Sequence, residues 1–202
     1  MARVQQRHPA NVDGAWFVDT RCIDCDASRQ LAPDLIGRVD RTSVVIRQPT
    51  TPEEEHRMWL AALACPTRSI GTAPPRPEPR GIYPHHLEDG VHHCGFNSTD
   101  SFGANAFFVV RPEGNLLIDA PRWTRKLAEP FEEAGGIAHV LLTHRDDVAD
   151  AERYAEVFGA RVWIHEHDAS AAPFATDILR GADPTEIRPG LVAIPVPGHT
   201  EG

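Results

Sequence analysis

The 202-residue sequence predicts an α/β protein, a small α+β unit followed by a larger layered α/β domain. Two observations support this prediction. Residues 71–86 contain five prolines and two glycines, a composition that favours an extended, stiff linker over a helix or a central strand. After this segment, strand-like runs alternate with helical segments, as they do in layered α/β domains. We therefore expect domains at 11–72 and 91–202, joined by a linker at 73–90.

The N-terminal unit contains one clear helix and two expected strands. Pro52 is followed by three glutamates, and proline with acidic residues in the first turn favours a helix start. This helix is expected to run to Ala64, because Pro66 then stops it. Residues 15–19 and 43–47 are expected to form strands that pair with each other.

The second domain shows a hairpin and then alternating elements. Residues 106–110 and 116–119 flank a Pro-Glu-Gly-Asn turn, which indicates a β-hairpin. Glycines mark the ends of two helices. The further elements expected are a helix at 124–134, a strand at 139–142, a helix at 150–158, a strand at 161–165 and a strand at 191–196.

Composition narrows the classes of partner. The formal net charge is -9 and no basic stripe is present, which argues against nucleic-acid binding through phosphate contacts. No apolar run approaches the ~18 residues of a membrane-spanning helix, and the N-terminus lacks a signal-peptide core. We expect a cytoplasmic protein without a membrane partner. Its four cysteines then favour ligands, catalytic groups or buried thiols over disulfides.

Three cysteines and one serine form the first candidate site. Cys22 and Cys25 are two residues apart, and a remote Cys65 is followed by proline, the spacing of a bacterial ferredoxin. Ser28 stands where the third cysteine of that motif belongs. Three outcomes stay open: a cluster with an oxygen ligand, a three-iron cluster on three thiolates, or no cluster. Zinc on the three cysteines is a fourth alternative.

Two histidines at strand ends form the second candidate site. The hydrophobic run at 137–142 leads to His144, followed by Asp146, Asp147 and Asp150, and the run at 191–196 leads to His199. Two such strand ends with carboxylates provide the donors that a divalent metal needs. The excess of carboxylates shifts the preference from zinc towards iron(II) or manganese(II).

These motifs carry a family resemblance. The segment Thr143–Asp150 and the sequence Pro-Gly-His199-Thr-Glu-Gly resemble the metallo-β-lactamase superfamily, and with the cysteine unit the chain resembles ferredoxin-fused hydrolases of this fold over residues 11–202. The resemblance implies an αββα domain, with metal ligands at His144, Asp146, Asp150 and His199. It also implies that Asp119 orders the loops of the site. Ser28 and Ala151 depart from the ligand residues of the family pattern.

The implied activity is hydrolysis. A bound Zn, Fe or Mn would activate water to attack an ester, thioester or similar small-molecule substrate. The resemblance further implies an aspartate bridge and a last histidine on strands beyond His199, so the second domain is expected to be truncated at its C-terminus. The alternative is an iron–sulfur protein, with a 4Fe-4S or 3Fe-4S cluster on Cys22, Cys25, Ser28 and Cys65, a redox partner, and a catalytically degraded hydrolase-like scaffold.

Overall fold

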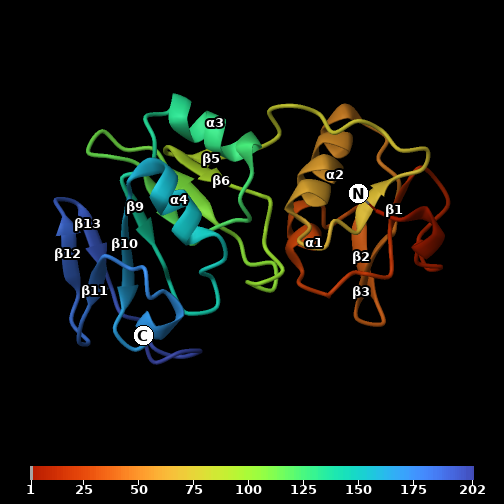
Figure 1. The fold of residues 1–202 in the computed structure, drawn as a ribbon. Coiled ribbons are helices and arrows are strands. Elements are labelled where there is room, and N and C mark those ends of the chain that lie inside the picture. The colour runs from red at the N-terminus through yellow and green to blue at the C-terminus, as the bar shows by residue number, and fades with distance from the viewer. Residues whose placement is uncertain (1) are drawn as a thin grey trace.

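Two short antiparallel strand pairs and two helices make up the N-terminal domain. The computed structural model describes residues 2–202, and the red-to-yellow part of Figure 1 is this domain. The strands pair as β1 with β4 and β2 with β3. The elements are η1 (Val4–Gln6), β1 (Trp16–Val18), α1 (Ala27–Leu31), β2 (Ile36–Val39), β3 (Thr42–Val45), α2 (Pro52–Ala64) and β4 (Ile70–Thr72).

The strand partners within this domain differ from the prediction. The strand near 43–47 was expected to pair with 15–19, but β3 pairs with β2, and β1 pairs with β4. The reason is the turn between β2 and β3, where Asp40 and Arg41 both have positive φ, 45° and 62°. Two successive residues of that conformation favour a tight hairpin. The local pairing therefore forms at low entropic cost, and β1 pairs with the later strand.

The helix predicted from Pro52 to Ala64 is confirmed as α2. Thr51 caps the helix, its Oγ1 accepting a hydrogen bond from Glu54 N at 3.2 Å. Three glutamates occupy the first turn, where the helix dipole favours them. Residues 58–64 are buried. Tyr83, just before the second domain, donates a hydrogen bond to Leu60 O at 3.0 Å, so this helix also contacts the chain that leads into the next domain.

A seven-stranded mixed sheet forms the centre of the C-terminal domain. Its strand order is β11-β10-β9-β8-β7-β6-β5, antiparallel from β5 to β8 and parallel from β8 to β11. The strands are β5 (His85–Glu88), β6 (Val91–His93), β7 (Phe107–Val109), β8 (Leu116–Ile118), β9 (His139–Leu141), β10 (Arg161–His165) and β11 (Asp177–Leu179). The remaining elements are α3 (Arg125–Glu133), α4 (Ala151–Phe158), η2 (Ala169–Ala171), and the separate hairpin of β12 (Thr185–Arg188) and β13 (Leu191–Ala193).

The predicted α/β class is therefore confirmed, and the expected hairpin is present as β7 and β8. Strand β5 lies within the segment expected to be the linker, so the chain joins the sheet before residue 91. Within residues 2–202, no helix is long and apolar enough to cross a membrane.

One edge of the sheet collects polar side chains. Parallel strands end at the same edge, so the residues that follow β8, β9 and β10 come together there. Those residues include Asp119 after β8, His144 after β9 and Asp168 after β10. The loop between β6 and β7 also reaches this region, and in Figure 1 the yellow-green segment approaches the N-terminal domain. The fold thus places a polar site next to the domain boundary.

Candidate metal centres

Three of the predicted ligands lie together. The structure brings His144, Asp146 and His199 within reach of one ion, since one donor atom from each lies within 4.8 Å of the others. His199 Nε2 lies 3.0 Å from Asp146 Oδ2. All three come from loops, His144 and Asp146 after β9 and His199 from the segment after β13. Two imidazoles and a carboxylate are a donor set for zinc, iron or manganese.

The ring of His144 is oriented by its own loop. Asp146 N donates a hydrogen bond to His144 Nδ1 at 2.9 Å. Since Nδ1 accepts this bond, Nε2 is the nitrogen left to carry a proton or to bind a metal. Asp147 Oδ2 lies 3.5 Å from that Nε2, which puts a second carboxylate at the same position.

Asp150, the fourth predicted ligand, lies elsewhere. Its Oδ2 accepts a hydrogen bond from Trp123 N at 2.6 Å, and the residue stands at the N-terminus of α4. Ala149, with a φ of 37°, turns the chain just before it. The structure therefore does not bring Asp150 to the other three ligands, and gives it a role in holding the segment before α3.

Asp119 fixes the start of the ligand loop. Its Oδ1 accepts a hydrogen bond from Thr143 N at 2.7 Å, and its Oδ2 accepts one from the Thr143 hydroxyl at 2.8 Å. Burial raises the pKa of Asp119 to about 6, although both bonds favour the carboxylate. The residue has a φ of 53°, which is uncommon outside glycine. This geometry fits the loop-ordering role that the family resemblance implied.

A residue that was not among the predicted ligands joins the two ligand segments. Asp168 is fully buried. Its Oδ1 accepts a hydrogen bond from Arg145 Nε at 2.7 Å, and its Oδ2 accepts one from the Thr200 hydroxyl at 2.8 Å. Burial alone would raise the pKa of Asp168, but these bonds outweigh it and the pKa is lowered. Arg145 is next to His144 and Thr200 is next to His199. One carboxylate therefore holds both segments, and its position after β10 at the ligand-bearing sheet edge was the available signal.

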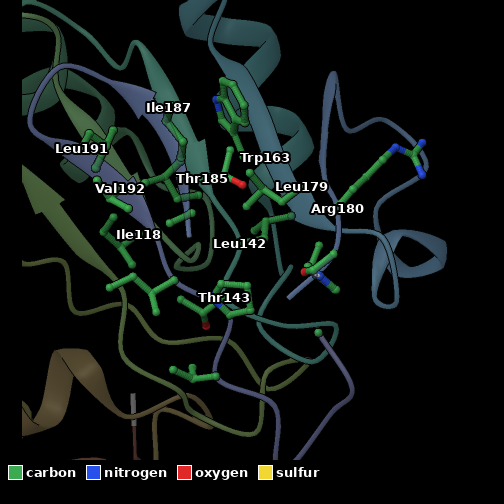
Figure 2. A pocket seen from close by; sticks show the side chains of 18 residues that line it. Ile118, Leu142, Thr143, Trp163, Leu179, Arg180, Thr185, Ile187, Leu191 and Val192 are labelled. Carbon is green, nitrogen blue, oxygen red and sulfur yellow. Dashed lines mark hydrogen bonds between the residues drawn. The ribbon is translucent and has the colours of Figure 1, made fainter. Parts of the chain in front are cut away.

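The three ligands open into a cavity of about 340 Å³. Both domains contribute to it, the N-terminal domain through the segment that begins at Cys25 and the C-terminal domain through two loops. The lining residues are Cys25, Ala27, Gln30, Ser101, Phe102, Gly103, Ala104, Asn105, His144, Asp146, Asp147 and His199. A second, more apolar cavity of about 320 Å³ lies between the sheet and the β12–β13 hairpin, where Figure 2 shows Trp163, Leu142 and Ile187. None of the three ligands lines that apolar cavity, so we assign the chemistry to the polar one.

The predicted thiol site also comes together. Cys22, Cys25, Ser28 and Cys65 line one small cavity of about 10 Å³ in the N-terminal domain. Backbone N–H groups point at two of the sulfurs, from Asp24 and Ser43 to Cys22 at 3.4 Å and from Ser69 to Cys65 at 3.3 Å. Burial raises the pKa of the Cys25 thiol, and the neighbouring Cys65 and Cys22 raise it further.

This donor set fits a group held by thiolates. Asp24 and Asp26 have positive φ, 61° and 72°, and such loops turn successive backbone N–H groups towards an anion. Ser28 is buried and lines the same small cavity as the three cysteines. Three sulfurs and one hydroxyl could hold an iron–sulfur cluster, which supplies one-electron chemistry when bound. Cys94, the fourth cysteine, lies in the core, where burial raises the pKa of its thiol.

Two family models match separate parts of the chain. A family model described as "4Fe-4S single cluster domain of Ferredoxin I" matches residues 18–72, and the model of the metallo-beta-lactamase superfamily matches residues 85–201. The second match covers more than half of the chain, and the protein therefore belongs to the metallo-beta-lactamase superfamily. A search of curated proteins gave no match.

Solved structures that match part of the chain include several metallo-beta-lactamases. The native FEZ-1 enzyme from Legionella gormanii is 19% identical, with a TM-score of 0.45, covering 63% of this chain and 58% of that one. GOB-18 from Elizabethkingia meningoseptica is 15% identical, with a TM-score of 0.45 and coverage of 63% and 57%. The class B3 di-zinc enzyme LRA-12 from an Alaskan soil metagenome is 15% identical, with a TM-score of 0.44 and coverage of 58% and 53%. The chain thus spans little more than half the length of these enzymes.

Proposed function

We propose that this protein is a metal-dependent hydrolase whose divalent ion is held by His144, Asp146 and His199. The observation that carries the proposal is the convergence of these three donors, from segments 53 residues apart, within 4.8 Å of one another. Membership of the metallo-beta-lactamase superfamily supports hydrolysis in general. We propose an ester, a thioester or a similar small molecule as the substrate.

Each residue of the site has a separate role in the proposed hydrolysis. His144 Nε2, Asp146 and His199 hold the ion, while Asp119 and Asp168 fix the loops that carry them. A bound divalent ion lowers the pKa of water and polarises a carbonyl oxygen. Asp147 lies 3.5 Å from His144 Nε2, where its carboxylate can accept a hydrogen bond from water and orient it. The cavity beside these residues gives the carbonyl compound access.

Metal titration combined with ester hydrolysis tests this proposal. The full chain is titrated with Zn(II) and Mn(II) by calorimetry, and hydrolysis of 4-nitrophenyl acetate is followed with and without the metal. We expect binding and metal-dependent turnover in the unaltered protein, and loss of both in His199→Ala. Turnover that is unaffected by chelators would contradict the proposal.

The second candidate function is iron–sulfur redox chemistry. It is favoured by one observation, the thiol cavity formed by Cys22, Cys25, Ser28 and Cys65, and by the match to a 4Fe-4S domain over the same residues. In this function the C-terminal domain serves as a scaffold and a redox partner exchanges electrons with the cluster.

Anaerobic purification without chelators separates the two functions. Iron and acid-labile sulfide in a ratio of about 4:4 or 3:4, as a 4Fe-4S or a 3Fe-4S cluster requires, together with charge-transfer absorbance in the visible range, would support the redox function. Ser28→Cys offers a sharp comparison, because a fourth thiolate should retain more iron and sulfide per chain. If neither protein contains sulfide, the redox function is rejected.

A further inference from the structure

The cavity beside the metal ligands has a wall that belongs to the other domain. Gln30 of α1 lies at this wall, where its Oε1 accepts a hydrogen bond from Asn105 Nδ2 at 3.2 Å. Its Nε2 donates a long bond of 3.3 Å to Asp26 Oδ2. Since an amide can donate two bonds and accept two, Gln30 keeps one donor and one acceptor for a bound molecule.

Ser101 adds an unused hydrogen-bonding group to the same cavity. The residue is 6% exposed, and its Oγ has no hydrogen-bond partner among residues 2–202. A buried hydroxyl without a partner costs about 1–3 kcal/mol. The oxygen itself is covered, so a ligand in the cavity would remove this cost by hydrogen-bonding to Ser101 after a rotation about χ1 that turns Oγ into the cavity.

Charge and size define the class of ligand. Among the described residues that line the cavity there is no lysine or arginine, and Asp146 and Asp147 contribute carboxylates. An anionic molecule would meet negative charge without a compensating cation other than the metal. The volume of about 340 Å³ is at the lower end of small-molecule sites, which span roughly 300–1,000 Å³. These properties favour a small, uncharged molecule with hydrogen-bonding groups.

We propose that the substrate binds across the domain boundary, with Gln30 and Ser101 hydrogen-bonding a small uncharged ester, thioester or amide whose carbonyl faces His144, Asp146 and His199. This inference rests on the proposed hydrolase function and adds the residues that select its substrate. The N-terminal domain is then part of the substrate site, because Gln30 belongs to it.

Kinetics of matched variants test the proposal. The full chain, loaded with Zn(II), hydrolyses 4-nitrophenyl acetate as the neutral probe and 4-nitrophenyl hemisuccinate as the anionic one. Loss of one neutral hydrogen bond corresponds to about a five-fold change. We expect Gln30→Ala and Ser101→Ala to raise KM for the acetate about five-fold with kcat within two-fold. Gln5→Ala, an exposed glutamine outside the cavity, is the control and should leave KM unchanged. The hemisuccinate should be the poorer substrate by about ten-fold.

A binding measurement gives a readout without turnover. Acetohydroxamic acid, which is uncharged in neutral solution and binds zinc as the hydroxamate with release of a proton to the buffer, is titrated into the zinc-loaded protein by calorimetry. Its Kd should rise about five-fold in Gln30→Ala and stay the same in Gln5→Ala, with zinc affinity equal in all three proteins.

The two proposals fail in different ways. Zinc binding and ester hydrolysis with an unchanged KM and hydroxamate Kd in Gln30→Ala and Ser101→Ala would overturn this inference and leave the hydrolase function standing. An equal effect in Gln5→Ala, or better hydrolysis of the anionic ester, would overturn it as well. An unaltered chain that neither binds zinc nor hydrolyses the acetate would overturn both.

Discussion

The two candidate metal centres differ in how the chain encloses them. The thiol site surrounds a cavity of only about 10 Å³ with sulfur and backbone N–H groups, whereas the site at His144, Asp146 and His199 opens into about 340 Å³. At about 10 Å³ the first cavity holds about one water molecule, so the loop around the sulfurs would have to widen to take up a cluster. The second cavity already leaves room for water and a substrate beside nitrogen and oxygen donors. Ligand type and free volume together therefore favour a hydrolytic role for the open site.

The two sites are also assembled differently. Cys22 and Cys25 lie in one loop and Ser28 lies in the first turn of the helix α1 that follows it, so only Cys65 comes from elsewhere in the chain. The second site needs loops after β9 and β13, and the buried Asp168 holds both through Arg145 and Thr200. The first site depends on local backbone conformation, and the second depends on the packing of the sheet edge. Substitutions should therefore affect the two sites separately.

The largest expected effect is loss of a ligand. His144→Ala should lower zinc affinity at the open site by more than the ~10–100-fold typical of outer-shell partners, while iron and sulfide content stays unchanged. Cys65→Ala should do the reverse, because it removes a sulfur from the thiol site only. Calorimetry and elemental analysis of both variants check this. If Cys65→Ala abolished zinc binding as well, the two centres would not be independent.

The next effect concerns the support of the open site. Asp119→Ala leaves Thr143 N–H and the Thr143 hydroxyl without their acceptor, so the loop before His144 should loosen. We expect zinc affinity to fall about 10–100-fold, measured by competition with a chromophoric chelator. Asp119→Asn retains a side-chain acceptor and tolerates positive φ, and should recover most of the affinity. Equal affinities for both variants would show that Asp119 does not order the loop.

A contact between the two regions gives a third test. Gly103 has a φ of 85°, and a Cβ built there would lie 2.8 Å from Cys25 Sγ. Gly103→Ala should therefore displace the loop from Cys25 and lower stability by about 1–3 kcal/mol through the clash, beyond the cost of positive φ. Gly81→Ala is the matched control, since Gly81 has a φ of 70° and nothing within 4 Å.

Urea unfolding measures both glycine variants, and alkylation of Cys25 by iodoacetamide reports the loop. We expect faster alkylation in Gly103→Ala only. Similar stability losses and alkylation rates in the two variants would mean that the loop does not pack on Cys25 in solution.

The smallest expected effect is the pH dependence of the N-terminal domain. Burial would raise the pKa of Asp19, but hydrogen bonds from Arg21, Arg3 N and Ser69 outweigh it and lower the pKa below its ordinary value of 3.8. A lowered folded-state pKa means that this stabilisation is complete above pH ~3.8 and is lost as pH falls through the folded-state value.

The free energy of unfolding, measured in urea from pH 6 to pH 2, should therefore fall more steeply in the unaltered chain than in Asp19→Asn. At pH 6 we expect Asp19→Asn to be less stable by about 1–2 kcal/mol. Asp13→Asn, an exposed position, should follow the unaltered chain. If the free energy of unfolding depended on pH in the same way in all three proteins, Asp19 would not contribute to the pH dependence.

Much of the fold could be predicted because its signals are local. Helix α2 carries its own cap and first-turn acids, and the β7–β8 hairpin carries its turn. The pairing of β1 with β4 could not be predicted in the same way, because the two strands are more than 50 residues apart and only the tertiary fold decides between partners. The β2–β3 hairpin, in contrast, has a local cause in the turn at Asp40 and Arg41.

The candidate sites could likewise be predicted only where the signal is local. His144 and His199 follow hydrophobic runs, so their meeting at one sheet edge was foreseeable. Asp150 was not, because the spacing of residues cannot give the path of a loop, and the turn at Ala149 directs its carboxylate to Trp123 N. The wall formed by Gln30 depends on how the domains pack, which no motif encodes.

The most direct test of the central claim, a divalent metal on His144, Asp146 and His199, is X-ray absorption at the zinc edge of the full chain with one equivalent of Zn(II). We expect nitrogen and oxygen neighbours at about 2.0–2.1 Å, including the outer-ring scattering of imidazole, and no sulfur. Sulfur neighbours at about 2.3 Å would place the zinc on the cysteines and contradict the claim.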